Sequence, residues 1–324
     1  MLDLTISIVN YDTSEMIVKC LDSIFKFTKN LNFEVIVVDN GSSDGSPEII
    51  AERFPSVKLI KNQQNEGFAR AHNKAFKLSS SKYFVVLNSD VVIEHNAFKE
   101  LVDFMEKNPD VALLSPKVFY PDGRIQDIID YSPSIKDVLL KIFYRVKLIN
   151  KEKFHAYSPI NFNYNQMKIL TSNEYITGCC YCVRREHIKN DELFDEKFSP
   201  VYFEDTDLCA RLINAGFKVV YYPKTYVIHH HGYTVYKKRE SNYKDFVNFR
   251  VIYRLNRYYY FRKHKGYIQE ILVRLLDFAE SLILLTWRLP KWFLEKKQHD
   301  RIYLEIDFNT LKASLGLIKK HKLV

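Results

Sequence analysis

The sequence predicts an α/β fold with a mostly parallel central sheet, helices on both faces of that sheet, and a helical C-terminal tail. Residues 1–115 alternate short apolar runs, rich in β-branched residues, with segments of helical periodicity. Such alternation calls for right-handed crossovers between parallel strands. At 324 residues and 47% hydrophobic, the chain is long enough for one large domain and an appendage.

The first two expected strands each lead to polar residues. Residues 4–9 form a strand, and Ser14 is the expected N-cap of the following helix. Residues 34–38 form the second strand, which ends at Asp39. A turn rich in glycine and serine then leads to a helix with Ser46 as its N-cap and a proline at its first position. Asp39 is therefore expected at the carboxyl end of a strand.

Two more strands carry polar residues to the same edge of the sheet. A short strand at 57–60 precedes Asn65, and a strand at 83–87 precedes Asp90. The remaining elements of this region are helices at 69–78 and 96–107 and a strand at 111–115. Ligands bind beyond the carboxyl ends of strands in open α/β sheets, so Asp39, Asn65 and Asp90 are expected along one ligand-binding rim.

Asp90 is the candidate metal ligand. It follows an apolar, β-branched run of the kind found in central parallel strands. Asn88 and Asp90 point to the same side of an extended chain. An ordinary turn is the alternative for Asn88-Ser89-Asp90, because all three residue types favour turns.

Residues 116–170 lose the alternation and are expected to form an irregular insert near the mouth of the site. The alternation returns at 175–183, a strand that contains Cys179, Cys180 and Cys182. A zinc site was considered for these cysteines. Adjacent cysteines on a strand point to opposite faces, and no second Cys/His pair lies at zinc spacing, so small buried residues are favoured.

A helix that is expected to end at Gly216 opens with three carboxylates, Glu204, Asp205 and Asp207. Acidic residues also favour the first turn of any helix, which is the alternative explanation. However, Asp205 shares the apolar face of this helix with Leu208, and a carboxylate on an apolar face needs a reason. We therefore expect Asp205 to have a functional role, with Glu204 and Asp207 as supporting charges.

A later strand ends in the histidines of residues 229–231. Alternation along the strand places His229 and His231 on one side. A histidine cluster on the surface is the alternative to a functional site.

The positive charge of the chain belongs to its tail. Residues 233–324 contain 20 lysines and arginines against 9 acidic residues, a balance of +11, whereas residues 1–232 contain 28 against 30. Such a tail suggests an acidic partner, either anionic lipid or nucleic acid. An apolar stripe from Ile268 to Ile283, followed by Trp287 and Trp292, fits either packing on its own domain or a membrane interface.

The short apolar stretches and the cysteine content suggest a cytoplasmic location. No stretch reaches 18 apolar residues, and the first apolar segment is too short for a signal peptide, so neither a spanning helix nor a signal peptide is expected. Five cysteines, an odd number without the two CxxC pairs of a zinc site, suit a reducing cytosol.

Taken together, these segments resemble the inverting glycosyltransferases of family 2, which have the nucleotide-binding GT-A fold, and most of all their bacterial rhamnosyltransferase-like members. The matching segments are 6–11, 37–46, 65–73, 87–90, Gly178 with 183–185, 203–208, and Pro223 with His229. The resemblance implies a GT-A domain at 1–232 and assigns 233–324 to a basic, aromatic-rich helical tail. It implies transfer of a sugar from dTDP-rhamnose or a UDP-hexose to a hydroxyl of a glycan or polyprenyl-linked glycan.

The resemblance also implies residue roles. Asp205 is the general base with Glu204 beside it, and Asp90 and His229 hold a divalent cation, Mg²⁺ or Mn²⁺. The nucleotide-sugar-binding residues are Val9, Tyr11, Asp39, Asn65, Gly67, Arg70, Asn73, Asn88 and Ser89, with Asp39 accepting a hydrogen bond from the base. Gly178 and Asp207 lie on the acceptor side. The family's usual Asp-x-Asp motif is Asn88-Ser89-Asp90 here, which implies weaker metal affinity.

Two other functions were considered. A sugar-phosphate nucleotidylyltransferase would need a glycine-rich phosphate loop after the first strand, and no glycine precedes Gly41. A non-catalytic sugar-nucleotide-binding protein is the other alternative. Carboxylates along the rim repel phosphate backbones, so no nucleic-acid partner is expected. The tail then favours an anionic membrane, with the enzyme peripheral on the inner face of the cell membrane.

Overall fold

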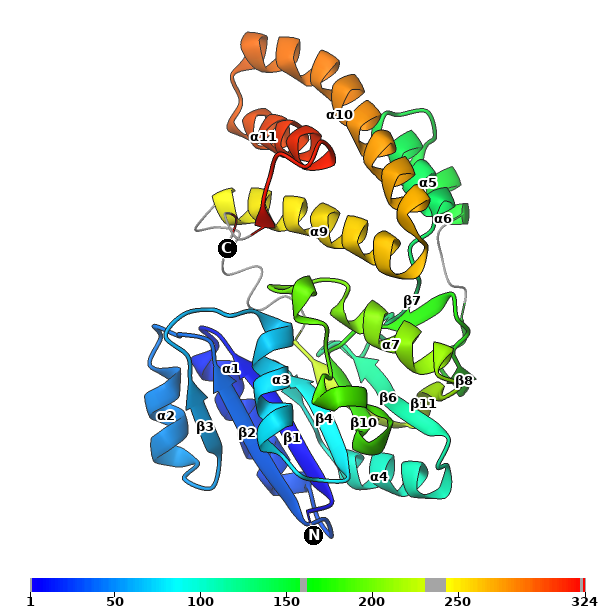
Figure 1. Cartoon of the computed structure of the whole chain (residues 1–324). Helices are drawn as coiled ribbons and strands as arrows, with labels where there is room; N and C mark the ends of the chain where they lie inside the picture. Colours follow the sequence, from blue (N-terminus) through cyan, green and yellow to red (C-terminus); the bar gives the residue numbers. More distant parts are fainter. Residues whose placement is uncertain (1, 158–161, 231–242, 321–322, 324) are drawn as a thin grey trace. The chain divides into compact units, whose positions relative to one another are not determined.

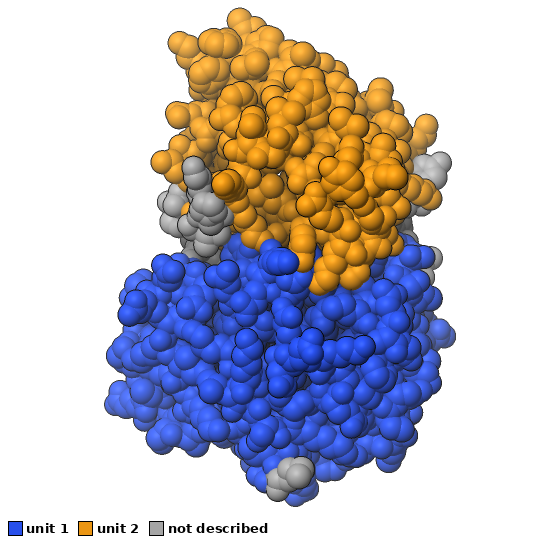
Figure 2. Space-filling model, viewed as in Figure 1, with its two compact units in different colours: residues 1–132, 161–200, 204–235 blue, residues 133–160, 201–203, 236–324 orange. Residues whose placement is uncertain are grey.

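The computed structural model describes residues 2–157, 162–230, 243–320 and 323. The chain divides into two compact units (Figures 1 and 2). Unit 1 comprises residues 1–132, 161–200 and 204–235, and unit 2 comprises residues 133–160, 201–203 and 236–324. The domain boundary predicted at residue 232 lies outside the described residues.

Unit 1 is built on a nine-stranded sheet. Its strands are β1 (Leu4–Asn10), β2 (Phe33–Asp39), β3 (Lys58–Lys61), β4 (Tyr83–Asn88), β5 (Val91–Val92), β6 (Val111–Phe119), β8 (Lys168–Ile169), β10 (Cys180–Arg184) and β11 (Lys218–His229). Their order is β3-β2-β1-β4-β10-β6-β11-β5, and β8 pairs with β11. β10 runs antiparallel to β4 and β6, and β5 and β8 run antiparallel to β11. The other six strands share one direction, which confirms a mixed but mostly parallel sheet.

Helices cover this sheet. The helices of unit 1 are α1 (Ser14–Phe27), α2 (Ser46–Arg53), α3 (Phe68–Leu78), α4 (Ala97–Lys107) and α7 (Glu204–Asn214). Leu4, Ile6 and Ile8 on one face of β1 and Ser7 on the other are all fully buried. The Ser7 hydroxyl lies 2.8 Å from Nδ1 of His72, which places α3 on that face. The sheet is therefore a buried central layer, as its apolar strands predict.

Residues 116–170 are more regular than the insert that the sequence suggested. They contain the end of β6, strand β7 (Ile129–Tyr131), and helices α5 (Ile135–Arg145) and α6 (Lys151–Tyr157). Ser134 and Asp137 form a capping box at the start of α5, a local signal that explains the helix. Residues 133–160 belong to unit 2, so this segment divides between the two units.

Unit 2 is helical and has a charged interior. Its long helices are α9 (Tyr243–His264), α10 (Tyr267–Glu295) and α11 (Gln298–Ser314). Asp277 of α10 is fully buried and pairs with Arg254 and Arg257 of α9, each 2.5 Å away. Burial opposes ionisation of Asp277, but the two arginines outweigh it and hold the carboxyl pKa below its ordinary value. Ion pairs therefore join the helices of this unit.

The apolar stripe predicted on α10 does not pack inward. Ile268 and Leu275 are exposed, whereas Glu270, Asp277 and Glu280 are buried. Both alternatives for this stripe, packing on the domain and a membrane interface, stay predictions. Within the described part of the chain, every helix is either too short or too polar to cross a membrane.

Gly67, which precedes α3, is needed for a close backbone contact. Its φ is +89°, and a Cβ added there would lie 2.5 Å from Cα of Pro200. The amide of Phe68 donates a 2.8 Å hydrogen bond to the Pro200 carbonyl. The structure thus gives this glycine a role in fixing the segment before α7 against the start of α3.

We expect Gly67→Ala to lower the free energy of unfolding by about 3 kcal/mol or more, since the alanine meets both a glycine-specific backbone conformation and the Pro200 backbone. Gly45→Ala is the matched control, because Gly45 has a φ of +79° with nothing within 4 Å of an added Cβ. Its cost is about 1–2 kcal/mol from backbone strain alone. Urea unfolding measures both; equal losses would show that the Pro200 contact is unimportant.

Candidate active site

The predicted metal ligands Asp90 and His229 lie together at one edge of the sheet. Asp90 follows β4, and the pairing of β5 with β11 sets His229 opposite Val91. Nε2 of His229 lies 3.1 Å from Oδ1 of Asp90, and the His230 amide donates a 2.9 Å hydrogen bond to the Asp90 carbonyl. Both side chains are largely buried. The sheet thus joins two residues that lie far apart in the sequence.

Gln126 orients the His229 ring. Its Oε1 lies 2.9 Å from Nδ1 of His229. With a proton on Nδ1 donated to Gln126, Nε2 is the ring nitrogen that faces Asp90 and the one that would bind a metal ion. Gln126 lies in a loop without a motif, and its role follows only from this contact.

The surroundings of His229 favour the protonated form of its ring. Burial alone would lower the pKa of the imidazole, but Cys179 and Asp90 outweigh it and raise the pKa to about 10. The side-chain nitrogen Nδ2 of Asn88 lies 3.4 Å from Nε2 of His229. A divalent ion bound between His229 and Asp90 would therefore replace a proton.

The number of protein ligands limits which metal fits. Among the residues that the structure describes, no three His, Cys, Asp or Glu side chains gather into a metal-binding group. As the predicted metal ligands, Asp90 and His229 would supply two protein ligands. Two ligands fit a Mg²⁺-like ion that keeps water and substrate phosphate oxygens, and they do not fit a four-ligand structural zinc.

Asp205, the predicted base, lies in the first turn of α7. Its Oδ1 accepts a 2.7 Å hydrogen bond from the Tyr181 hydroxyl, and its Oδ2 accepts a 2.8 Å hydrogen bond from the Gly178 amide. A Cβ on Gly178 would lie 2.5 Å from Oδ1, so only glycine admits the carboxylate this closely. Burial raises the pKa of Asp205 to about 6, against the lowering effect of these two donors.

A backbone crossing connects the base to the metal-ligand pair. The strand predicted at 175–183 is two strands, β9 (Glu174–Ile176) and β10, and residues 177–179 separate them. Within this break, the Gly178 amide binds Asp205 and the Cys179 carbonyl accepts a 2.9 Å hydrogen bond from the amide of Asn88. Asp90 is two residues beyond Asn88. Residues 178 and 179 therefore contact both the Asp205 carboxylate and the end of β4, two residues before Asp90.

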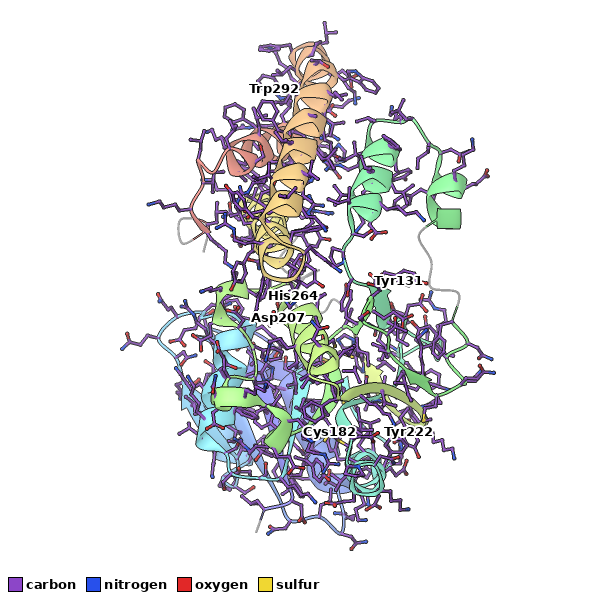
Figure 3. All side chains as sticks on the ribbon, turned by 45° about the vertical axis from the view of Figure 1, so that its right-hand side comes forward. Tyr131, Cys182, Asp207, Tyr222, His264 and Trp292 are labelled. Carbon is purple, nitrogen blue, oxygen red and sulfur yellow. The ribbon has the colours of Figure 1, made fainter. Side chains whose placement is uncertain are left out.

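The other two acids of α7 have different surroundings. Glu204, which precedes Asp205 in the sequence, is buried. Asp207 is fully buried, and Nε of Arg211 lies 2.7 Å from its Oδ2; Asp207 is labelled on α7 in Figure 3. The pairing with Arg211 stabilises the helix in this conformation, and the place of Asp207 on the acceptor side stays a prediction.

Asp39 lies in a dense hydrogen-bonded turn. Asn10 Nδ2 donates to it at 2.7 Å, the Ser42 hydroxyl at 2.5 Å, and the amides of Ser42 and Gly41 at 3.0 and 3.2 Å. These four donors engage both carboxylate oxygens. An N–H group of the nucleotide's base would therefore have to share one of these two oxygens with the donors of the protein.

Asn10 and Thr13 connect this turn to the end of β4. The Thr13 hydroxyl lies 2.6 Å from Oδ1 of Asn10 and 3.0 Å from the Ser89 hydroxyl. Val9 and Tyr11, which flank Asn10, are partly exposed at this edge. Asn10 falls in a segment that carries the family resemblance, but Thr13 follows that segment and had no signal of its own.

The predicted nucleotide-binding residues around α3 contact the protein itself. Oδ1 of Asn65 accepts a 2.9 Å hydrogen bond from the Gly67 amide. The Asn73 side chain bonds both the amide and the carbonyl of Phe194, at 2.9 and 2.8 Å. Arg70 lies 3.7 Å from Glu196. These contacts hold residues 194–200 against α3, and a role in nucleotide binding stays a prediction.

Known sequences match much of the chain. The family model described as Glycosyl transferase family 2 matches residues 5–190. An N-acetylglucosaminyl-diphospho-decaprenol L-rhamnosyltransferase from Mycobacterium tuberculosis is 28% identical over 214 residues, which cover 62% of this chain and 67% of the relative. The O-antigen biosynthesis protein RfbC from Myxococcus xanthus is 25% identical over 222 residues, which cover 68% of this chain but 16% of that protein.

Solved structures share the fold at low identity. The mannosyltransferase PcManGT from Pyrobaculum calidifontis, in complex with GDP-Man and Mn²⁺, has a TM-score of 0.50 and 14% identity, covering 98% of this chain and 89% of its own. GalNAc-T7 with UDP, GalNAc and Mn²⁺ has a TM-score of 0.51 and 14% identity, covering 71% and 44%. These likenesses show the GT-A fold. Because the family model spans more than half of its length, the chain belongs to glycosyl transferase family 2.

Proposed function

We propose that this protein transfers a sugar from a nucleoside-diphosphate sugar to a hydroxyl of a polyprenyl-linked glycan during synthesis of a bacterial surface polysaccharide. The observations that carry the proposal are the Asp90–His229 pair and the segment 178–179, which binds both the Asp205 carboxylate and the end of β4. The mycobacterial relative is an L-rhamnosyltransferase acting at a decaprenol-linked sugar, which favours dTDP-rhamnose as donor, with a UDP-hexose as the other candidate.

Asp90 and His229 would hold the divalent cation, with Gln126 fixing the ring of His229. When bound there, Mg²⁺ or Mn²⁺ supplies electrostatic stabilisation of the departing diphosphate. The structural neighbours that hold Mn²⁺ support this assignment. Asp90 as the only carboxylate of Asn88-Ser89-Asp90 leaves coordination positions for phosphate oxygens and water.

Asp205 would take the proton from the acceptor hydroxyl. Its pKa of about 6 keeps the carboxylate ionised at neutral pH while leaving it more basic than an ordinary aspartate. Tyr181 and Gly178 hold both carboxylate oxygens, so the base is oriented before the acceptor arrives. One base and direct in-line attack on the donor give inversion at the anomeric carbon.

A lipid-linked acceptor requires the enzyme at a membrane surface. The balance of +11 in residues 233–324 supports attraction to anionic lipids, at roughly 1 kcal/mol for each basic residue near the surface. We therefore place the protein peripherally on the inner face of the cell membrane.

The first test is nucleoside-diphosphate release. We expect wild type, with Mn²⁺ and a polyprenyl-diphosphate N-acetylglucosamine acceptor, to release the nucleotide from one donor of a panel containing dTDP-rhamnose and UDP-hexoses. Asp205→Asn should lower turnover about 10²- to 10⁴-fold while donor binding by calorimetry is retained. Asp103→Asn, a surface change paired only with Lys99, is the control. Donor binding without any release by wild type would indicate a non-catalytic binder.

The second test is the pH dependence of kcat/KM. The rate should fall below about pH 6, because protonated Asp205 cannot act as a base. Tyr181→Phe removes a donor to the ionised carboxylate, so the acid limb should move to higher pH. Tyr221→Phe, which removes a buried hydroxyl bonded to the Tyr164 carbonyl, should leave the limb unchanged. An identical shift in both variants would argue against Asp205 as the base.

The third test concerns the cation. Asp90→Ala should abolish Mn²⁺-dependent turnover and weaken Mn²⁺ binding, measured by electron paramagnetic resonance with nucleoside diphosphate present, at least tenfold, because one of two protein ligands is lost. Asp103→Ala should bind Mn²⁺ as wild type does. Unchanged Mn²⁺ affinity in Asp90→Ala would remove Asp90 from the site.

A further inference from the structure

Helix α10 buries acidic residues within unit 2 and exposes an apolar face. Its buried residues include Glu270, Asp277 and Glu280, which are at most 2% exposed. In contrast, Ile268 is 74% exposed and Leu275 is 58% exposed. A helix on the surface of a water-soluble domain normally has the opposite arrangement.

The inward charges are matched by partners from neighbouring helices. Glu280 pairs with Arg145 of α5 at 2.8 Å and with Arg254 of α9 at 2.9 Å. Arg274 of α10 donates to Glu270 at 2.8 Å and to the Ala313 carbonyl at the end of α11 at 3.0 Å. Breaking buried pairs of this kind is costly, so these contacts hold the rotational setting of α10 within unit 2.

The outward face of α10 is apolar throughout. All of α10 is described, and the exposed residues from Ile268 to Leu289 are Ile268, Ile271, Leu272, Leu275, Ala279, Leu282, Ile283, Thr286, Trp287 and Leu289. The hydroxyl of Thr286 donates a 2.7 Å hydrogen bond to the Ile283 carbonyl, so its hydrogen-bond donor is satisfied within the helix. At 1.5 Å per residue, the 22 residues from Ile268 to Leu289 extend roughly 33 Å. A continuous exposed apolar face of this length marks an interaction surface.

Basic residues lie at both ends of this face. Lys263 and Lys265 precede the start of α10, and Lys291, Lys296 and Lys297 lie at its end. Trp287 is exposed near that end, and Trp292 is labelled there in Figure 3. Cations and tryptophans beside an apolar face match the head-group region of an anionic bilayer. A second copy of the chain would instead bring two like-charged tails of +11 together.

We propose that α10 lies in the plane of an anionic bilayer, with the face from Ile268 to Leu289 inserted between head groups and acyl chains. This deepens the proposed membrane location, on which it rests, by naming the inserted element. The ion pairs of Glu270, Asp277 and Glu280 stay within the protein, and the lysines at the ends of α10 contact lipid phosphates.

The test is flotation of the full-length protein with phosphatidylglycerol-containing vesicles and with pure phosphatidylcholine vesicles. We expect wild type to float with the anionic vesicles. Leu275→Glu combined with Ile283→Glu should lower partitioning at least tenfold, since two side chains no longer enter the apolar layer. Leu78→Glu, which changes a 62% exposed leucine of α3 in unit 1, is the matched control and should float as wild type does.

Two further measurements separate the possible outcomes. The double variant should keep the unfolding midpoint of wild type and its Mn²⁺-dependent release of nucleoside diphosphate with water as acceptor, so a failure of membrane binding is distinguishable from a failure of transfer. Equal flotation of the double variant and wild type would overturn the proposal. A wild-type dimer in light scattering that the double variant converts to monomer would also overturn it, in favour of a second copy on this face.

Discussion

The candidate site depends on residues 178 and 179, whose backbone groups bind the Asp205 carboxylate and the strand that leads to Asp90. The amide of Gly178 binds Asp205, and the carbonyl of Cys179 binds the amide of Asn88 two residues before Asp90. Both anchors are backbone groups held by the pairing of β4 with β10, so their positions do not depend on side-chain rotamers. A reaction that needs a cation at one side and a base at the other benefits from this rigidity, because catalysis is sensitive to small displacements.

Buried hydrogen bonds complete the same edge of the sheet. Asn10, fully buried at the end of β1, contacts Asp39, Ser46 and Thr13, and Thr13 reaches Ser89. Polar groups inside a protein are costly unless they are paired, and a satisfied network defines a single arrangement. The carboxyl ends of β1, β2 and β4 are thereby fixed relative to one another before any ligand binds.

Ion pairs join the helices in the interior of unit 2, whereas apolar side chains fill the interior of unit 1. Arginines from α5 and α9 pair with acids of α10, and the apolar stripe of α10 from Ile268 to Ile283 is exposed. Buried ion pairs carry a desolvation cost that apolar residues would avoid. An apolar environment on the outer surface of α10 would explain this arrangement. Charged residues of α10 are unfavourable in such an environment, so they face the interior of unit 2 and pair there.

The sequence by itself determined the local elements and the residue types of the site. Alternating apolar runs located β1 to β4, and the positions of Asp90, Asp205 and His229 followed from strand ends and a helix start. Tertiary structure alone decided the partners: Gln126 meets His229 across 103 positions, and Tyr181 meets Asp205 only because β10 passes α7. It also decided that the apolar stripe of α10 faces outward. Periodicity reports that polar and apolar residues are separated around a helix, but the direction of each face depends on neighbouring elements that local sequence does not encode.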